Sequence, residues 1–153
     1  MKIDRDNRST THKYVDLLII DEMLPCDFSP FRSLEYSHYL SFFDASILVS
    51  TEGWHSWASN LRFDQHIEKS VLSEKVKSKI KRISEFDKII PSVAYITFLH
   101  NAFQAFPLLE ERNIPFILQL YPGGGFELNN EQSDEKLRLL SKSPLCLKII
   151  TTQ

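Results

Sequence analysis

Five short apolar blocks recur along the chain, and they constrain its fold more than any other feature of the sequence. Within each block, aliphatic and β-branched residues occupy successive positions, whereas a strand with one face in water would alternate apolar and polar residues. Successive apolar positions are typical of strands that helices cover on both faces of a parallel sheet. We therefore predict buried strands at residues 15–20, 45–50, 93–98, 116–121 and 147–151.

Segments with helical signals separate these blocks. Ser29 and Pro30 provide a capping oxygen followed by a proline at the first helical position, which predicts a helix that runs to about Leu40. A second helix is predicted at 67–83, because four apolar residues at i, i+4, i+8 and i+11 form a single stripe. These residues are Leu72, Val76, Ile80 and Ile83.

Two further helices are predicted in the second half of the chain. One is expected at 101–112 with Asn113 as its stop, and Pro107 either kinks this helix or marks a late start. The other begins at Ser133, which is predicted to cap it, with Asp134 in the positive first turn.

The alternation of strand and helix predicts an α/β fold, namely a Rossmann-like three-layer domain with a mostly parallel sheet of about five strands. The length of 153 residues corresponds to about one domain. We place this domain at 15–153, after a flexible N-terminal arm at 1–14. Since the fifth block is followed by no helix that would cover it, we expect the domain to be incomplete at its C-terminus and the chain to be a fragment of a longer protein.

Composition and charge exclude several classes of protein. The formal charge of −2 argues against a dedicated nucleic-acid binder, which usually carries a basic surplus. Cys26 and Cys146 are far apart, and no metal-ligand spacing occurs, so we predict no metal site. With no secretory signal and no apolar run of about 20 residues, we expect a cytoplasmic protein. The basic run from Lys75 to Arg82 indicates either a solvated helix face or a peripheral contact with the inner membrane.

Candidate functional residues follow the predicted strands, because ligands of open α/β sheets bind at the carboxyl ends of the strands. Asp21 and Glu22 are candidate catalytic bases, or a loop pair held by backbone amides. His100 is a candidate general base, or a histidine satisfied within the core. Arg32 either lines a cleft at these strand ends, together with the other candidates, or forms an ion pair with Glu35 one helical turn away.

Two loops add candidate binding residues. The consecutive Gly123, Gly124 and Gly125 either offer bare amides to an oxyanion or a sugar hydroxyl, or form a flexible turn. They match neither the dinucleotide fingerprint nor the P-loop. Trp54, in the long loop at 51–65, either stacks on a sugar ring or anchors the loop.

Two stretches of the chain resemble bacterial glycosyltransferases of the GT-B architecture. The stretch at 15–39 contains the first strand, an Asp-Glu-Met-Leu-Pro segment and a Ser-Pro-Phe-Arg-Ser-Leu-Glu-Tyr segment. The stretch at 108–126 contains a helix, Asn-Ile-Pro, a strand and the glycine loop, a succession that is common in the N-terminal domains of these enzymes. The resemblance covers most of residues 15–153 and lies in the succession of strands, helices and loops.

The resemblance implies one half of a GT-B architecture, the acceptor-side domain of an enzyme of polysaccharide biosynthesis. Such an enzyme moves a sugar from a nucleotide sugar to a hydroxyl of a sugar or glycolipid acceptor. The domain itself would bind no cofactor, because a C-terminal domain binds the nucleotide sugar as co-substrate, and we expect this chain alone to be inactive. The resemblance extends to His100 and the three glycines as base and acceptor-side residues. The alternatives are a stand-alone α/β module that binds a ligand or a protein without enzymatic activity, and a remnant that acts through protein interaction.

Overall fold

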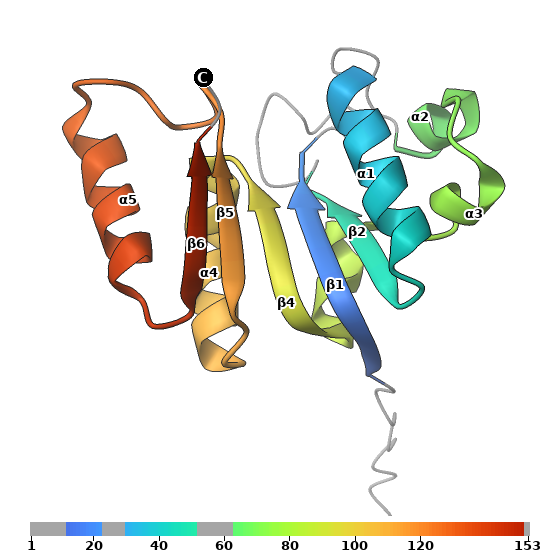
Figure 1. The fold of residues 1–153 in the computed structure, drawn as a ribbon, viewed down its shortest axis with the longest axis horizontal. Coiled ribbons are helices and arrows are strands. Elements are labelled where there is room, and N and C mark those ends of the chain that lie inside the picture. The colour runs from blue at the N-terminus through green and yellow to red at the C-terminus, as the bar shows by residue number, and fades with distance from the viewer. Residues whose placement is uncertain (1–11, 23–29, 52–62, 152–153) are drawn as a thin grey trace, which may run out of the picture.

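A six-stranded parallel sheet runs through the computed structural model, which describes residues 12–22, 30–51 and 63–151 (Figure 1). The strands are β1 (Lys13–Asp21), β2 (Ser46–Ser50), β3 (Ile80–Arg82), β4 (Ile89–Thr97), β5 (Phe116–Leu120) and β6 (Cys146–Thr151). The helices are α1 (Pro30–Phe42), α2 (Phe63–Lys69), α3 (Glu74–Lys77), α4 (Leu99–Glu111) and α5 (Glu131–Lys142), with a 3-10 helix, η1 (Ile83–Lys88). The predicted α/β, Rossmann-like fold is confirmed, with one strand more than expected.

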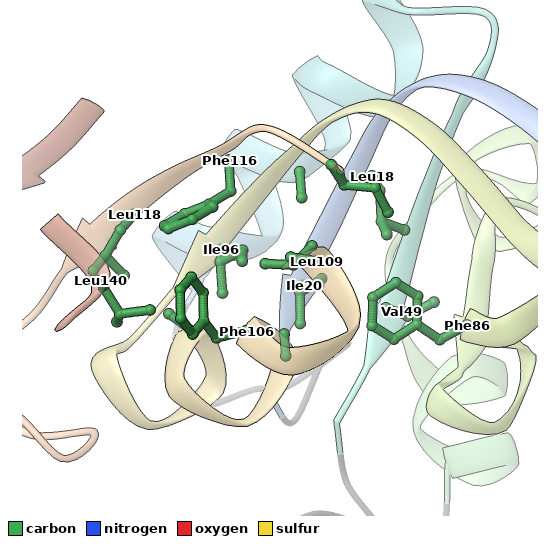
Figure 2. Close-up of a cluster of buried hydrophobic side chains, with 14 of the residues drawn as sticks. Leu18, Ile20, Val49, Phe86, Ile96, Phe106, Leu109, Phe116, Leu118 and Leu140 are labelled. Carbon is green, nitrogen blue, oxygen red and sulfur yellow. The ribbon is translucent and has the colours of Figure 1, made fainter. Parts of the chain in front are cut away.

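Helices cover both faces of the sheet, and each face has its own apolar core. Figure 2 shows Leu18 and Ile20 of β1 in the same cluster as Leu109 of α4. Ile19, which lies between them in the sequence, belongs to the opposite cluster with Leu40 of α1. Because successive side chains of a strand point to opposite faces, the consecutive apolar residues of β1 supply both cores.

The order of the strands places a reversal of the chain path in the middle of the sheet. The order is β3-β2-β1-β4-β5-β6, so β1 pairs with β2 on one side and with β4 on the other. The chain moves outward from β1 to β3, returns to the centre, and moves outward again from β4 to β6. In doubly wound sheets, ligands bind at the carboxyl ends of the two strands that flank such a reversal.

All five predicted strands are present, with shifted ends. β4 begins earlier than predicted, at Ile89, and β1 begins at Lys13. The first two residues of β1 therefore lie in the segment that was predicted as an N-terminal arm, and residues 1–11 lie outside the described residues.

The helix predicted at 67–83 is wrong. This segment contains the end of α2, the short helix α3 and the additional strand β3. Ser73 starts a new helix as the N-cap of α3, where its hydroxyl accepts the amide hydrogen of Val76 at 3.4 Å. Ile80 then pairs with Leu48 of β2. The helical spacing was misleading because α3 and β3 bury Val76 and Ile80 in the same core.

The basic run from Lys75 to Arg82 is therefore not one helix face. Lys79 lies between α3 and β3, and its ammonium group donates hydrogen bonds to the carbonyl oxygens of Leu40 and Phe43, at 2.5 and 2.8 Å. These carbonyls lie at the C-terminal end of α1, where a helix leaves acceptors without partners. Desolvation lowers the pKa of Lys79. The central lysine of the run thus stabilises the end of a helix.

The helix α4 begins at Leu99 and contains Pro107 in its interior, so it does not start at the proline. Asn113 follows the helix with a φ of 54°, the left-handed conformation that commonly ends helices, as predicted. None of the helices within the described ranges is long and apolar enough to cross a membrane.

The helix α5 begins before the predicted cap. Its N-cap is Asn130, whose side-chain oxygen accepts the amide hydrogen of Ser133 at 3.0 Å. Asparagine caps helices as well as serine does, so the prediction that Ser133 is the cap is wrong by three positions. The hydroxyl of Ser133 instead accepts the amide hydrogen of Glu127 at 3.2 Å.

Candidate functional site

Two pairs of side chains lie next to each other where β1 ends. Asp21 is the last residue of β1, and Glu22 follows it. Asp21 pairs with Arg32 in the first turn of α1, and Glu22 pairs with His100 in the first turn of α4. The helices α1 and α4 cover opposite faces of the sheet (Figure 1). The two pairs therefore join both helix layers to the carboxyl edge.

The carboxyl group of Asp21 is fully buried and holds the guanidinium group of Arg32. Nη1 of Arg32 lies 2.8 Å from Oδ1 and 3.0 Å from Oδ2 of this carboxyl group. Burial raises the pKa of Asp21 to about 7, although Arg32 acts in the opposite direction. A carboxyl group that is shielded from solvent and bound to Arg32 is suited to positioning that side chain.

The imidazole ring of His100 is oriented by Glu22. Its Nε2 atom lies 2.6 Å from Oε2 of Glu22, and the two side chains are 17% and 7% exposed, respectively. A carboxylate on one ring nitrogen fixes both the ring plane and the position of the ring proton, an arrangement that histidine general bases use. His100 therefore has the geometry of a base, and its catalytic role stays a prediction.

The three glycines form a tight turn against His100. Gly123 and Phe126 exchange two backbone hydrogen bonds, at 3.2 and 2.9 Å. The two central residues, Gly124 and Gly125, have φ values of 55° and 82°, a conformation that glycine adopts without a steric cost. The carbonyl oxygen of Gly124 accepts the amide hydrogen of His100 at 3.1 Å. The glycine turn and the first turn of α4 are thus in direct contact.

This contact defines a positioning role for the glycine turn. A Cβ atom on Gly125 would lie 3.0 Å from Cβ of His100, so glycine permits the close approach of the turn to α4. The amide of Gly123 is already bonded to Phe126 within the turn. The turn supports the histidine directly, while the binding of a substrate by these glycines stays a prediction.

Phe98 belongs to the site, although sequence reasoning assigned it to a strand. Its ring centroid lies 5.0 Å from the guanidinium carbon of Arg32. The ring stacks on the imidazole of His100 with 5.6 Å between centroids and 8° between planes, and it lies 5.7 Å from the ring of Tyr121. No sequence signal could have identified Phe98, because an aromatic residue at the end of an apolar block also fits a strand.

A chain of buried polar side chains connects the elements around the site. The hydroxyl of Thr51 donates to Oδ1 of Asn101 at 3.0 Å, and Nδ2 of Asn101 donates to the carbonyl oxygen of Thr97 at 2.8 Å. The hydroxyls of Thr97 and Tyr36 share a further hydrogen bond. Sequence reasoning missed this chain, although Thr51 and Thr97 lie at the carboxyl ends of predicted strands and the rule for strand ends applies to them.

The structure brings most of the predicted site residues together at this edge: Asp21, Glu22, Arg32, His100, Gly123, Gly124 and Gly125. Trp54 lies outside the described residues. Arg32 pairs with Asp21 rather than Glu35, whose carboxylate accepts hydrogen bonds from Tyr39 at 3.0 Å and Tyr95 at 3.2 Å. Within 12–22, 30–51 and 63–151, no three His, Cys, Asp or Glu residues form a group that could hold a metal ion.

No protein-family model, curated protein or solved structure matches this chain.

Proposed function

We propose that this chain is the acceptor-side domain of a GT-B glycosyltransferase, which moves a sugar from a nucleotide sugar to an acceptor hydroxyl. The observation that carries the proposal is the pairing of His100 with Glu22, at 2.6 Å, on the carboxyl edge between β1 and β4. The resemblance to these enzymes supports it, because the stretch at 15–39 contains Glu22 and the stretch at 108–126 ends in the glycine turn against His100.

The proposed chemistry assigns a different role to each residue of the two pairs. The imidazole of His100 accepts the proton of the acceptor hydroxyl as the hydroxyl oxygen bonds to the anomeric carbon of the donor sugar. The bond from that carbon to the phosphate oxygen of the nucleotide breaks, and the nucleotide leaves with the electron pair. Glu22 stabilises the resulting imidazolium ion. Asp21 holds Arg32 and takes no part in the proton transfer.

The proposal also defines the partners of the domain. The acceptor is a sugar or a glycolipid, and the donor nucleotide sugar binds to a second domain rather than to this one. A glycolipid acceptor would bring the protein to the cytoplasmic side of the inner membrane. Lys75, whose exposed side chain forms a surface ion pair with Asp44 at 3.6 Å, can exchange this partner for that contact, whereas the ammonium group of Lys79 is bound to the end of α1.

Ligand-observed NMR on this chain tests the binding part of the proposal. Saccharides and nucleotide sugars are titrated into the unmodified chain, into Glu22→Gln, and into Glu111→Gln as a control at the far end of α4. We expect saccharide binding to the first and last proteins, and binding at least about tenfold weaker to Glu22→Gln, equivalent to ~1.4 kcal/mol. Micromolar binding of a nucleotide sugar, or saccharide binding that Glu22→Gln leaves unchanged, would contradict the acceptor-side assignment.

A transfer assay tests the catalytic part. It uses the product of the whole gene that contains this chain, with a labelled nucleotide sugar and a mixture of membrane glycolipids and saccharides. Sugar transfer that His100→Ala abolishes is the expected result, because the proposed base is removed. Transfer that survives this substitution at the original rate would exclude His100 as the base.

A further inference from the structure

Phe98 connects β4 to α4 through a backbone conformation that residues other than glycine rarely adopt. Its φ is 77° and its ψ is 141°. The backbone is held on both sides: the amide of Phe98 donates to Gln119 of the neighbouring strand at 3.0 Å, and its carbonyl oxygen accepts from Ala102 of α4 at 3.1 Å. Glycine would satisfy the same connection without strain. Compared with glycine, phenylalanine at this strained position contributes only its phenyl ring.

The ring of Phe98 contacts one member of each of these two side-chain pairs. The guanidinium group of Arg32, which Asp21 holds, lies over the ring, and the imidazole of His100, which Glu22 holds, is parallel to it. Guanidinium groups and aromatic rings both interact favourably with an aromatic face. The ring is thus a common contact surface between two pairs that come from different helices.

The glycine turn leaves room for this ring. A Cβ atom on Gly124 would lie 2.6 Å from Cγ and 2.8 Å from Cβ of Phe98, closer than such carbon atoms approach in proteins. The ring is therefore enclosed by the glycine turn, by Arg32 and by His100. A side chain packed on these sides has few alternative positions.

We propose that Phe98 is a positioning residue, whose ring keeps the imidazole of His100 in the plane that preserves its hydrogen bond to Glu22 and fixes it relative to Arg32. The catalytic meaning of this inference rests on the proposed function, since the positioned group is the proposed base. The positioning itself is independent of any sugar and is measured on the protein alone.

Nitrogen-15 NMR of the histidine rings measures which nitrogen of His100 carries the proton. At a pH at which the ring of the unmodified protein is neutral, we expect its proton on Nε2, where Glu22 accepts the hydrogen bond. Phe98→Leu removes the flat face, and we expect a mixture of both tautomers together with loss of the Nε2 proton signal. Phe98→Tyr retains the ring, and we expect it to restore the spectrum of the unmodified protein.

Phe103→Leu is the matched control, because Phe103 also lies on α4 but its ring faces Lys136, at 5.3 Å. Amide spectra establish that each variant is folded, and Phe98→Met replaces Phe98→Leu if the latter does not fold, since methionine is apolar and adapts to irregular space. A single Nε2 tautomer in the folded leucine or methionine variant, or its loss in Phe98→Tyr, would overturn the inference. A failed saccharide titration beside the expected NMR result would count against the proposed function alone.

Discussion

Alanine substitutions at the three glycines after β5 would place a methyl group in three different surroundings. Comparing them separates the cost of backbone strain from the cost of steric overlap. All three have positive φ, at 84°, 55° and 82°, so alanine is strained at each position. A Cβ atom would meet nothing within 4 Å at Gly123. It would lie 3.0 Å from Cβ of His100 at Gly125, and 2.6 Å from Cγ of Phe98 at Gly124.

These contacts rank the three alanine substitutions by their effect on the free energy of unfolding. Gly123→Ala should lower it by about 1–2 kcal/mol, the cost of a left-handed backbone for an L-residue. Gly125→Ala should cost slightly more, about 2 kcal/mol, because the turn must move by a few tenths of an ångström. Gly124→Ala must also displace an enclosed ring, which adds about 1–3 kcal/mol and gives a total of about 2–5 kcal/mol.

Urea denaturation of the three variants measures this ranking, with the slope of the transition as a check that the unfolded states are comparable. Each alanine substitution is also combined with Phe98→Ala. If overlap with the ring causes the additional cost at Gly124, a double-mutant cycle should show that this cost disappears when the ring is absent.

Two results would refute this reasoning. Equal unfolding free energies for Gly123→Ala and Gly124→Ala would show that the turn moves away from the ring without cost. An additional cost at Gly124 that persists in the Phe98→Ala background would show that another contact determines it.

Three further predictions concern the ends of helices and the buried carboxyl group. Lys79→Met should lower the free energy of unfolding by about 1–2 kcal/mol, because the carbonyl groups at the end of α1 lose their hydrogen-bond donor. The control Lys75→Met, at an exposed position, should change it by less than about 0.5 kcal/mol. Equal urea midpoints for the two variants would refute this prediction. Asn130→Ala should cost about 1 kcal/mol through loss of the α5 cap, measured by thermal unfolding, with no shift as the contrary result. The pKa of Asp21 rises from 3.8 to about 7 on folding. Between these pH values the folded chain keeps a proton on Asp21 that the unfolded chain releases. The free energy of unfolding should therefore fall by up to about 4 kcal/mol as the pH rises from about 4 to 7. Asp21→Asn should remove this part of the pH dependence in urea titrations, and an unchanged profile would contradict the assignment.

The strands of this fold were predictable because their signal is local. Each apolar block is short and contiguous. A strand that is buried on both faces is apolar along its length, whatever its position in the sheet. β3 was missed because three residues are too few for a pattern, and Ile80 fitted the helical spacing of its neighbours. Ser73 was the available signal, since it caps a helix that starts within the predicted one.

The candidate site was predictable only as a neighbourhood. His100 and the glycine turn follow β4 and β5, which are adjacent parallel strands, so the rule for strand ends placed them at one edge. The rule did not reveal that Arg32 turns away from Glu35, its neighbour on the same helix, toward Asp21. Such a choice depends on the rotamers and on how closely α1 approaches the sheet.

By itself, the sequence determined that this chain forms strands buried on both sides, because consecutive apolar side chains point to opposite faces and each must leave water. Tertiary structure alone decided that β1 lies between β2 and β4, with α1 on one face and α4 on the other. That placement gives Asp21 and Glu22, which are adjacent in the sequence, partners on different helices. Sequence adjacency could not reveal these partners, because the alternation of side chains along a strand separates neighbours and the packing of the helices decides what each one meets.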